Sequence, residues 1–174
     1  NHEVADDGAQ KFLFGLADGR HIETVLIPER NHLTLCLSSQ VGCAQNCRFC
    51  LTARGGFQRN LTKAEIVSQV RDIKHQMEDS LPLSNLVFMG MGEPLNNLDN
   101  LLVALSILTD QKGLDLAGRR ITVSSCGIVP KMKLLGEKTN VNLAISLHAV
   151  DDEKRTMLMP INRRYPIEQL LRAC

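Results

Sequence analysis

Three cysteines lie close together in the sequence, Cys43, Cys47 and Cys50, at spacings of four and three. A short loop with this spacing can wrap its thiolates around one corner of a cuboidal iron–sulfur cluster. Three thiolates bind three irons, whereas a cluster that only carries electrons normally has four cysteine ligands. The spacing therefore favours a cluster with one open iron, to which a substrate can coordinate. Phe49, between the last two cysteines, would place an aromatic wall beside that cluster.

Two other thiol chemistries stay open for the same residues. Cys47 and Cys50 alone form a CxxC pair, which is typical of half a zinc site or of a redox pair. A zinc site needs a fourth ligand and usually a second pair, but the remaining cysteines, Cys36, Cys126 and Cys174, are isolated. A zinc-stabilised RNA-binding module with Cys36 as the fourth ligand is therefore the competing hypothesis.

The composition indicates an ordinary globular domain. The chain has 174 residues, of which 44% are hydrophobic and 22% charged, as in soluble single domains. No apolar run reaches the ~18 residues that span a bilayer, and the polar N-terminus is unlike a signal peptide. Six cysteines without a secretory signal indicate a reducing compartment. We expect a cytoplasmic protein with no membrane partner and, since it does not begin with Met, a fragment.

The distribution of charged residues is a weaker indication of function than the cysteine spacing. The net charge of +1 does not by itself indicate a nucleic-acid binder. Residues 43–63, however, contain no Asp or Glu. Their basic residues are Arg48, Arg54, Arg59 and Lys63. They predict a basic rim beside the cysteine loop, suited to RNA, although a solvated surface loop explains the pattern equally well.

The order of expected elements predicts an α/β fold. Residues 11–16 and 21–27 flank an Asp18-Gly19 turn, which predicts an N-terminal β-hairpin within residues 1–32. From residue 33 onward, apolar strands at 33–38, 86–89, 120–124 and 141–146 alternate with helices. The helices are expected after a Thr62/Glu65 capping box, at 98–108, from Val129, at 152–158 and from Pro166. This alternation predicts a parallel sheet of four βα units with its helices outside, over residues 33–174.

The candidate functional residues follow the strands of this sheet. In such folds the chemistry lies at the carboxyl ends of the strands. The cysteine loop follows the first strand and Gly90-Met91-Gly92-Glu93-Pro94 the second; Ser124 ends the third and Ser146-Leu147-His148 the fourth. The glycines let the backbone approach a ligand. The Glu93 carboxylate suits an ammonium group, although a helix-capping glutamate explains this pattern too.

The cysteine spacing resembles the CxxxCxxC signature of radical S-adenosylmethionine (SAM) enzymes. Together with segments 38–43, 56–62, 90–97, 145–149 and 159–162, the chain from about Ile22 onward resembles the RlmN-like dual-specificity adenine-C2 RNA methyltransferases. The resemblance implies a partial radical SAM (βα) barrel. The related Cfr group methylates adenine C8 instead. Val41 before Gly42, and Gly56-Phe57, look more like the C2 group, and C8 methylation stays an alternative.

The resemblance assigns a role to each candidate residue. It implies that Cys43, Cys47 and Cys50 bind a [4Fe–4S] cluster, that Glu23 accepts a proton, and that Cys36 resolves a protein–RNA adduct by forming a disulfide. The implied SAM contacts are Gly92, Glu93, Ser124, Ser146, Leu147 and His148. The implied substrates are 23S rRNA and tRNA, the electron donor is a reductase or a flavodoxin-type protein, and the full-length enzyme is a monomer.

The implied reaction needs a segment that this chain does not contain. In the family, one SAM methylates an enzyme cysteine, and a second SAM is cleaved to a radical that activates this S-methyl group for attack on C2. That cysteine lies in a C-terminal segment that would fall beyond residue 174. We therefore expect a core that lacks the last barrel strands and an N-terminal RNA-binding domain, and that is inactive alone.

Overall fold

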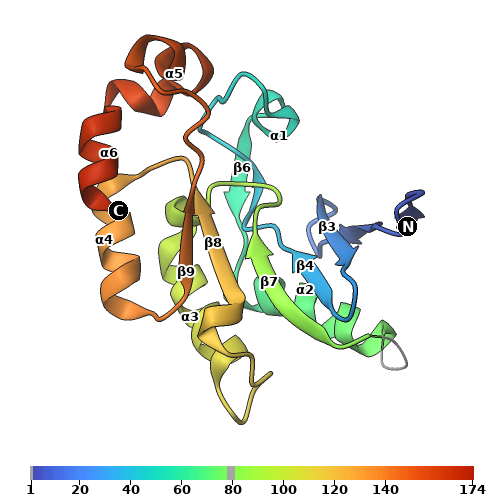
Figure 1. Cartoon of the computed structure of the whole chain (residues 1–174). Helices are drawn as coiled ribbons and strands as arrows, with labels where there is room; N and C mark the ends of the chain where they lie inside the picture. Colours follow the sequence, from blue (N-terminus) through green and yellow to red (C-terminus); the bar gives the residue numbers. More distant parts are fainter. Residues whose placement is uncertain (1, 78–80) are drawn as a thin grey trace.

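The computed structural model describes residues 2–77 and 81–174, which are built on a central seven-stranded sheet (Figure 1). The strand order across the sheet is β1-β2-β3-β4-β7-β8-β9. These strands are β1 (His2–Val4), β2 (Gln10–Gly15), β3 (His21–Pro28), β4 (Leu33–Cys36), β7 (Leu83–Phe88), β8 (Ile121–Ser125) and β9 (Asn142–Ile145). Strands β4, β7, β8 and β9 pair in parallel. The predicted α/β fold with four parallel strands is therefore confirmed.

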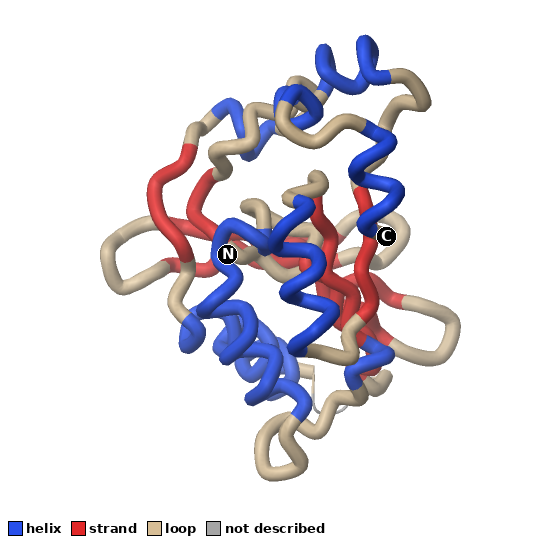
Figure 2. The backbone as a smooth tube through the Cα atoms, turned by 90° about the vertical axis from the view of Figure 1, so that its left-hand side faces the viewer, coloured by secondary structure: helices blue, strands red, loops and turns tan. Residues whose placement is uncertain are grey.

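The longer helices connect the parallel strands and lie on one face of the sheet, in front of the strands in Figure 2. The short helices at residues 51–54 and 152–158 lie beyond the upper ends of the strands in Figure 1. The α-helices are α1 (Leu51–Arg54), α2 (Lys63–Gln76), α3 (Leu98–Thr109), α4 (Val129–Lys138), α5 (Asp152–Leu158) and α6 (Ile167–Ala173). Short 3₁₀ helices are η1 (Pro94–Asn97), η2 (Gly118–Arg120) and η3 (Pro160–Arg163). The capping box at Thr62 and Glu65 is present, and the Asp151 side chain accepts a hydrogen bond from the amide of Lys154. The expected helix starts are therefore correct.

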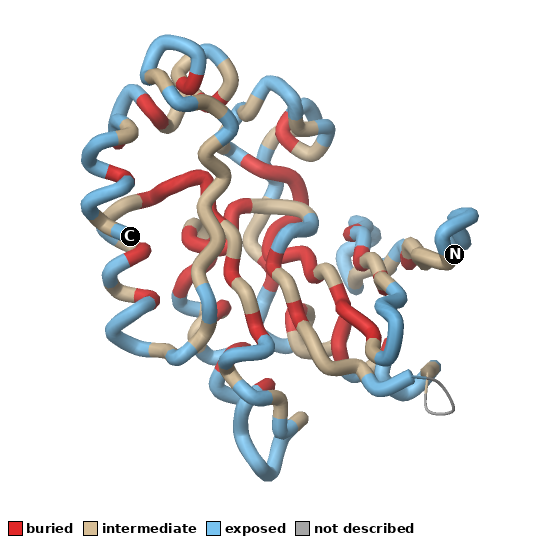
Figure 3. Tube along the Cα trace, in the orientation of Figure 1, coloured by how far each residue is buried: buried red, intermediate tan, exposed pale blue. Residues whose placement is uncertain are grey.

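The core lies between the sheet and these helices. Buried stretches follow the strands and the inner sides of α2 and α3, whereas the loop after α3 is largely exposed (Figure 3). Leu86 and Phe88 of β7 pair with Ile121 and Val123 of β8, and all four side chains are almost fully buried. Alternate residues of these strands face the helices, which leaves the opposite face of the sheet to carry more polar side chains.

The N-terminal hairpin continues the same sheet. Strands β2 and β3 pair antiparallel as expected, and β3 also pairs antiparallel with β4, with Val25 opposite Cys36. Ile22, Thr24 and Leu26 are buried, whereas Glu23 and Val25 alternate with them and face the other side. The hairpin is therefore joined edge to edge to the parallel strands, and the division into residues 1–32 and 33–174 stays a prediction.

Strands β1, β5 and β6 and helix α1 were not predicted. Strand β1 pairs with β2, while β5 (Gln40–Gly42) and β6 (Phe57–Asn60) form a separate two-stranded sheet. Neither β5 nor β6 shows an apolar alternation, because each is only three or four residues long and contains polar side chains that are buried or half-buried. The pairing of β5 with β6 closes the base of the loop that carries the three cysteines.

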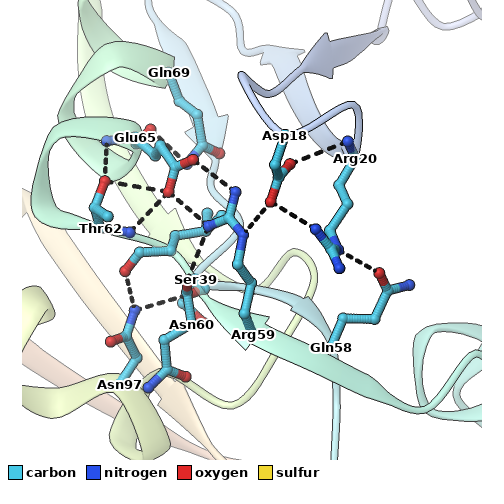
Figure 4. A network of polar contacts seen from close by, with 11 residues as sticks. Asp18, Arg20, Ser39, Gln58, Arg59, Asn60, Thr62, Glu65, Gln69 and Asn97 are labelled. Carbon is cyan, nitrogen blue, oxygen red and sulfur yellow. Dashed lines mark hydrogen bonds and ion pairs between the residues drawn. The ribbon is translucent and has the colours of Figure 1, made fainter.

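Arg59 on β6 ties the hairpin to α2 (Figure 4). Its Nε donates to Asp18 at 2.6 Å, and its two terminal nitrogens donate to the Glu65 carboxylate at 2.9 and 2.8 Å. The Arg59 guanidinium, with hydrogen bonds from Thr62, holds the pKa of the Glu65 carboxyl below its usual range. The basic rim expected from the sequence is thereby reduced, because the Arg59 charge is matched by the carboxylates of Glu65, which lies just outside residues 43–63, and of Asp18, which lies far from them in sequence.

Gln69 of α2 holds the chain where it leaves β4. Its Oε1 accepts hydrogen bonds from the Ser38 amide at 2.9 Å and the Thr24 hydroxyl at 2.8 Å, and its Nε2 donates to the Ser38 carbonyl at 3.0 Å. Gln69, Thr24 and Ser38 are all fully buried. A buried peptide group without such partners costs free energy, so Gln69 lets the chain turn away from the sheet inside the core.

We expect Gln69→Ala to lower the free energy of unfolding by about 2–4 kcal/mol, since buried groups lose their hydrogen-bond partners. The matched control is Gln76→Ala, which changes an exposed glutamine on the same helix and should have little effect. Urea denaturation of both variants measures the difference. Equal stability of the two variants would contradict this role.

Candidate active site

The site is a cavity of about 270 Å³ at the carboxyl ends of the parallel strands. This volume is close to the lower limit of small-molecule pockets, roughly 300 Å³. Its lining includes predicted residues from four separate segments of the chain: Cys43, Cys47, Cys50, Gly92, Glu93, Ser124 and Ser146. The expectation that the motifs meet at one end of the sheet is therefore correct for these seven residues.

The cysteine loop is fixed at its base and along its length. Gly42 has a positive φ of 72°, and a Cβ there would collide with the Gly56 carbonyl, so only glycine permits this close pairing of β5 and β6. The Cys43 amide donates to the Gly56 carbonyl at 3.0 Å, and the Arg48 amide donates to the Leu158 carbonyl at 2.9 Å. The loop is thus anchored to the small sheet on one side and to the end of α5 on the other.

Burial keeps thiols of this loop protonated when no metal is bound. Burial raises the pKa of Cys43, and it raises the pKa of Cys47 to about 11. Both are therefore protonated at neutral pH in the absence of metal, and binding of iron would displace their protons. All six cysteines are free, and no group of three His, Cys, Asp or Glu side chains in residues 2–77 and 81–174 is arranged around a single ion. A cluster is wider than an ion, so three separated thiols around a cavity fit it better than they fit tetrahedral zinc.

Gly92 brings the backbone of the second loop against the first. Its φ is 101°, and a Cβ would lie 2.5 Å from the Cβ of Gln40. The Gln40 side chain accepts a hydrogen bond from the Glu93 amide at 2.8 Å and donates to Asn60 at 2.7 Å. The close approach at Gly92 therefore lets Gln40 place Glu93 at the cavity.

Glu93 is both a cap and a cavity residue. Its Oε1 accepts from the Leu95 amide at 3.1 Å, and its Oε2 accepts from the Cys126 amide at 2.8 Å. The carboxylate is buried, and among the described residues it has no ion-pair partner. Capping does not prevent Glu93 from binding a ligand. An ionised carboxylate has acceptor positions beyond these two hydrogen bonds, so the same side chain can do both.

Leu147 and His148 do not line this cavity. The Leu147 side chain is half-buried, and His148 is exposed with a positive φ of 57°. The His148 ring lies 4.4 Å from the ring of Phe49, between centroids. The aromatic wall expected at Phe49 is present in the cavity lining, and His148 meets it from the loop after β9.

Glu23 and Cys36 lie outside the cavity lining but share a face of the sheet. Cys36 is opposite Val25, so the Glu23 and Cys36 side chains point to the same side of neighbouring strands.

Glu23 is half-exposed and lies 3.6 Å from the Lys11 ammonium. Its amide donates to the Met91 sulfur at 3.4 Å, and its carbonyl accepts from the Ser38 hydroxyl at 2.5 Å. Burial raises the pKa of the Cys36 thiol.

Several residues of the site were missed from sequence. Phe88, Met89 and Met159 add apolar surface to the cavity lining, and Ser125 adds a polar group. Arg155 lies fully buried behind the cavity. Nothing in the sequence indicated this burial, because an arginine in the middle of a short helix is normally expected to be exposed to solvent.

We expect Gly92→Ala to weaken SAM binding at least tenfold, because the added Cβ must displace Gln40 and, with it, Glu93. Gly19→Ala is the matched control, since Gly19 also has a positive φ, of 79°, but an added Cβ meets nothing within 4 Å. Calorimetric titration of SAM into each cluster-loaded variant measures the effect. Equal SAM affinities of the Gly92→Ala and Gly19→Ala variants would contradict the conclusion that the close approach at Gly92 positions Glu93.

Comparison with known proteins agrees with this geometry. Residues 37–174 match the radical SAM superfamily. The chain is 61% identical to the dual-specificity RNA methyltransferase RlmN of Desulfotalea psychrophila, over 99% of this chain and 50% of that protein. It is 55% identical to the protein of the same name from Pelobacter propionicus, over 99% and 49%. The chain thus spans about half the length of the curated relatives it matches.

A solved structure shows the same fold. The chain superposes on the crystal structure of a radical SAM methyltransferase from Sphaerobacter thermophilus with a TM-score of 0.94 and 44% identity, covering 100% of this chain and 52% of that one. In the described residues, 2–77 and 81–174, no helix is long and apolar enough to cross a membrane. The chain belongs to the radical SAM superfamily, and membership implies a [4Fe–4S] cluster and SAM as its cofactors.

Proposed function

We propose that this chain is the catalytic core of an enzyme that methylates C2 of adenine in 23S rRNA and tRNA. The observation that carries the proposal is the arrangement of two groups of residues. Three cysteines and Glu93 share one cavity, and Glu23 and Cys36 lie together on neighbouring strands of the same sheet. Similarity to two RlmN proteins supports an RNA substrate.

In this proposal the cavity residues hold the cofactors. Cys43, Cys47 and Cys50 would bind three irons of the cluster, and Glu93 would accept hydrogen bonds from the SAM ammonium group. When bound, the cluster and SAM supply a radical, which C2 requires because an electron-poor ring carbon has no lone pair to accept a methyl cation. Phe49 and the apolar part of the lining would shield the bound cofactors from water.

Glu23 and Cys36 would act on the RNA adduct. Glu23 would take the proton from C2; its carboxylate lies 3.6 Å from the Lys11 ammonium. The Cys36 sulfur would then attack the sulfur of the methyl-carrying cysteine and form a disulfide. The carbon leaves with the electron pair of the broken C–S bond and takes up a proton to become the methyl group. Cys36 must lose its own proton in this attack.

The remaining parts of the proposal concern partners. A reductase or a flavodoxin-type protein would supply the electron, and the full-length protein would act as a monomer in the cytoplasm, where its RNA substrates are. The methyl-carrying cysteine would come from a segment outside this chain. The chain by itself should therefore form no methyladenosine.

The proposal is tested by mass spectrometry of nucleosides from 23S rRNA and tRNA of cells that lack the full-length gene. Loss of 2-methyladenosine, and its return when the gene is restored, is the expected result. Loss of 8-methyladenosine instead would establish the C8 alternative. Unchanged methyladenosine of both kinds would contradict an RNA methyltransferase.

In the full-length protein, we expect Cys36→Ala to accumulate a covalent protein–RNA adduct, since no thiol remains to release it. Cys174→Ala, which removes an exposed thiol at the end of α6, is the control and should release methylated RNA. Denaturing gels after reaction with labelled RNA distinguish the two. Free RNA with Cys36→Ala and undiminished turnover would remove Cys36 from the mechanism.

A further inference from the structure

Arg155 of α5 is fully buried, and its guanidinium binds only uncharged acceptors. Nη1 donates to the Asn162 Oδ1 at 2.6 Å. Nη2 donates to the carbonyls of Cys126 at 2.8 Å and Ser146 at 3.4 Å, and Nε donates to the carbonyl of Leu147 at 3.2 Å. Within residues 2–77 and 81–174, no carboxylate lies at ion-pair distance from it.

A buried cation without a direct counter-ion is costly, because it loses its hydration. Burial lowers the pKa of the Arg155 guanidinium, but arginine stays protonated in proteins. The nearest carboxylate in the network, Asp152, is reached only through Asn162, whose Nδ2 donates to the Asp152 Oδ1 at 2.8 Å. An apolar side chain would fill this volume at lower cost. What an apolar side chain does not offer is a rigid fork of donors aimed at several carbonyls.

Those carbonyls belong to two strand-end loops that meet at the cavity. Cys126 follows β8, and Ser146 and Leu147 follow β9. The amide of Cys126 in turn donates to the Glu93 carboxylate at 2.8 Å. Arg155 is thus linked through one residue, Cys126, to the carboxylate of the loop after β7. A single guanidinium therefore connects the ends of three neighbouring parallel strands.

We propose that Arg155 is a positioning residue for SAM: it fixes the Cys126 and Ser146 carbonyls relative to each other, and thereby sets Glu93 and Ser146 around the cavity. Arg155 does not line the cavity itself, so it acts through these residues. Its positive charge lies behind the cavity wall, where it also favours the negative charge of a thiolate-bound cluster. The inference rests on the proposed SAM contacts and is independent of the RNA target.

The test uses Arg155→Lys and Arg155→Met in the full-length protein, reconstituted anaerobically with iron and sulfide. Arg163→Lys and Arg163→Met are matched controls, because Arg163 is an exposed arginine in the adjacent η3. Iron content and the thermal unfolding midpoint report on cluster and fold. Calorimetry gives the SAM dissociation constant, and the electron paramagnetic resonance spectrum of the reduced cluster shows whether added SAM reaches the iron.

We expect Arg155→Lys to keep its iron and a cooperative unfolding transition, but to bind SAM at least tenfold more weakly. A lysine ammonium keeps the charge but lacks the planar fork that spans both loops. Arg155→Met should lose more affinity, because it removes the charge as well. The spectral change on adding SAM should be smaller at a given SAM concentration in both variants, and the Arg163 controls should match the parent protein.

Two results would overturn the inference. The first is parental SAM affinity with Arg155→Lys in protein that retains its cluster. The second is a loss of affinity that only follows the fraction of protein that has lost iron or fold, which would make Arg155 a structural residue. If Arg155→Met does not fold, Arg155→Lys decides alone. These SAM-binding measurements contain no RNA, so their outcome does not depend on whether the protein methylates RNA.

Discussion

The site depends on one constraint: the backbone that leaves β4 must turn away from the sheet while it is buried. Ser38 and Ser39 lie between β4 and β5, and their main-chain groups have no neighbouring strand to bind there. Gln69 binds both the amide and the carbonyl of Ser38. Asn97 binds the carbonyl of Ser39 at 2.8 Å (Figure 4) and that of Leu61 at 2.7 Å. The amides of Ser39 and Gln40 bind the Met91 carbonyl. Side-chain amides thus replace the missing strand, and they place the cysteine loop against the Gly90–Pro94 loop.

Buried side chains also bind the main chain on the other side of the cavity. Glu93 accepts from the Cys126 amide, and Arg155 donates to the Cys126 carbonyl, so this one residue is held from both sides by buried side chains of opposite charge. Neither charge is neutralised by direct contact with the other. Such fully bonded polar networks give a precise geometry where an apolar core would allow several. A cofactor site needs that precision, because small displacements of its ligands reduce binding and rate.

Much of the fold could be predicted from sequence. The alternation of short apolar strands and amphipathic helices, the Thr62 capping box and the Asp18-Gly19 turn are local signals, and local signals give elements and their order. The cavity could be predicted in part, because motifs that follow parallel strands must meet at one edge of the sheet. Strands β5 and β6 could not be predicted, since their pairing depends on contacts between polar segments about 20 residues apart. Arg155 and Arg59 could not be interpreted correctly either, because whether an arginine is exposed, ion-paired or buried depends on tertiary neighbours.

With Cys43, Cys47 and Cys50 as its ligands, the cluster would keep one iron open to SAM. Mössbauer spectroscopy of protein reconstituted with ⁵⁷Fe, recorded with and without SAM, tests it most directly. We expect SAM to change the signal of one iron site in the cluster and to leave the other three unchanged. A spectrum in which all irons remain equivalent after SAM is added, or a protein that takes up zinc and forms no cluster, would contradict it.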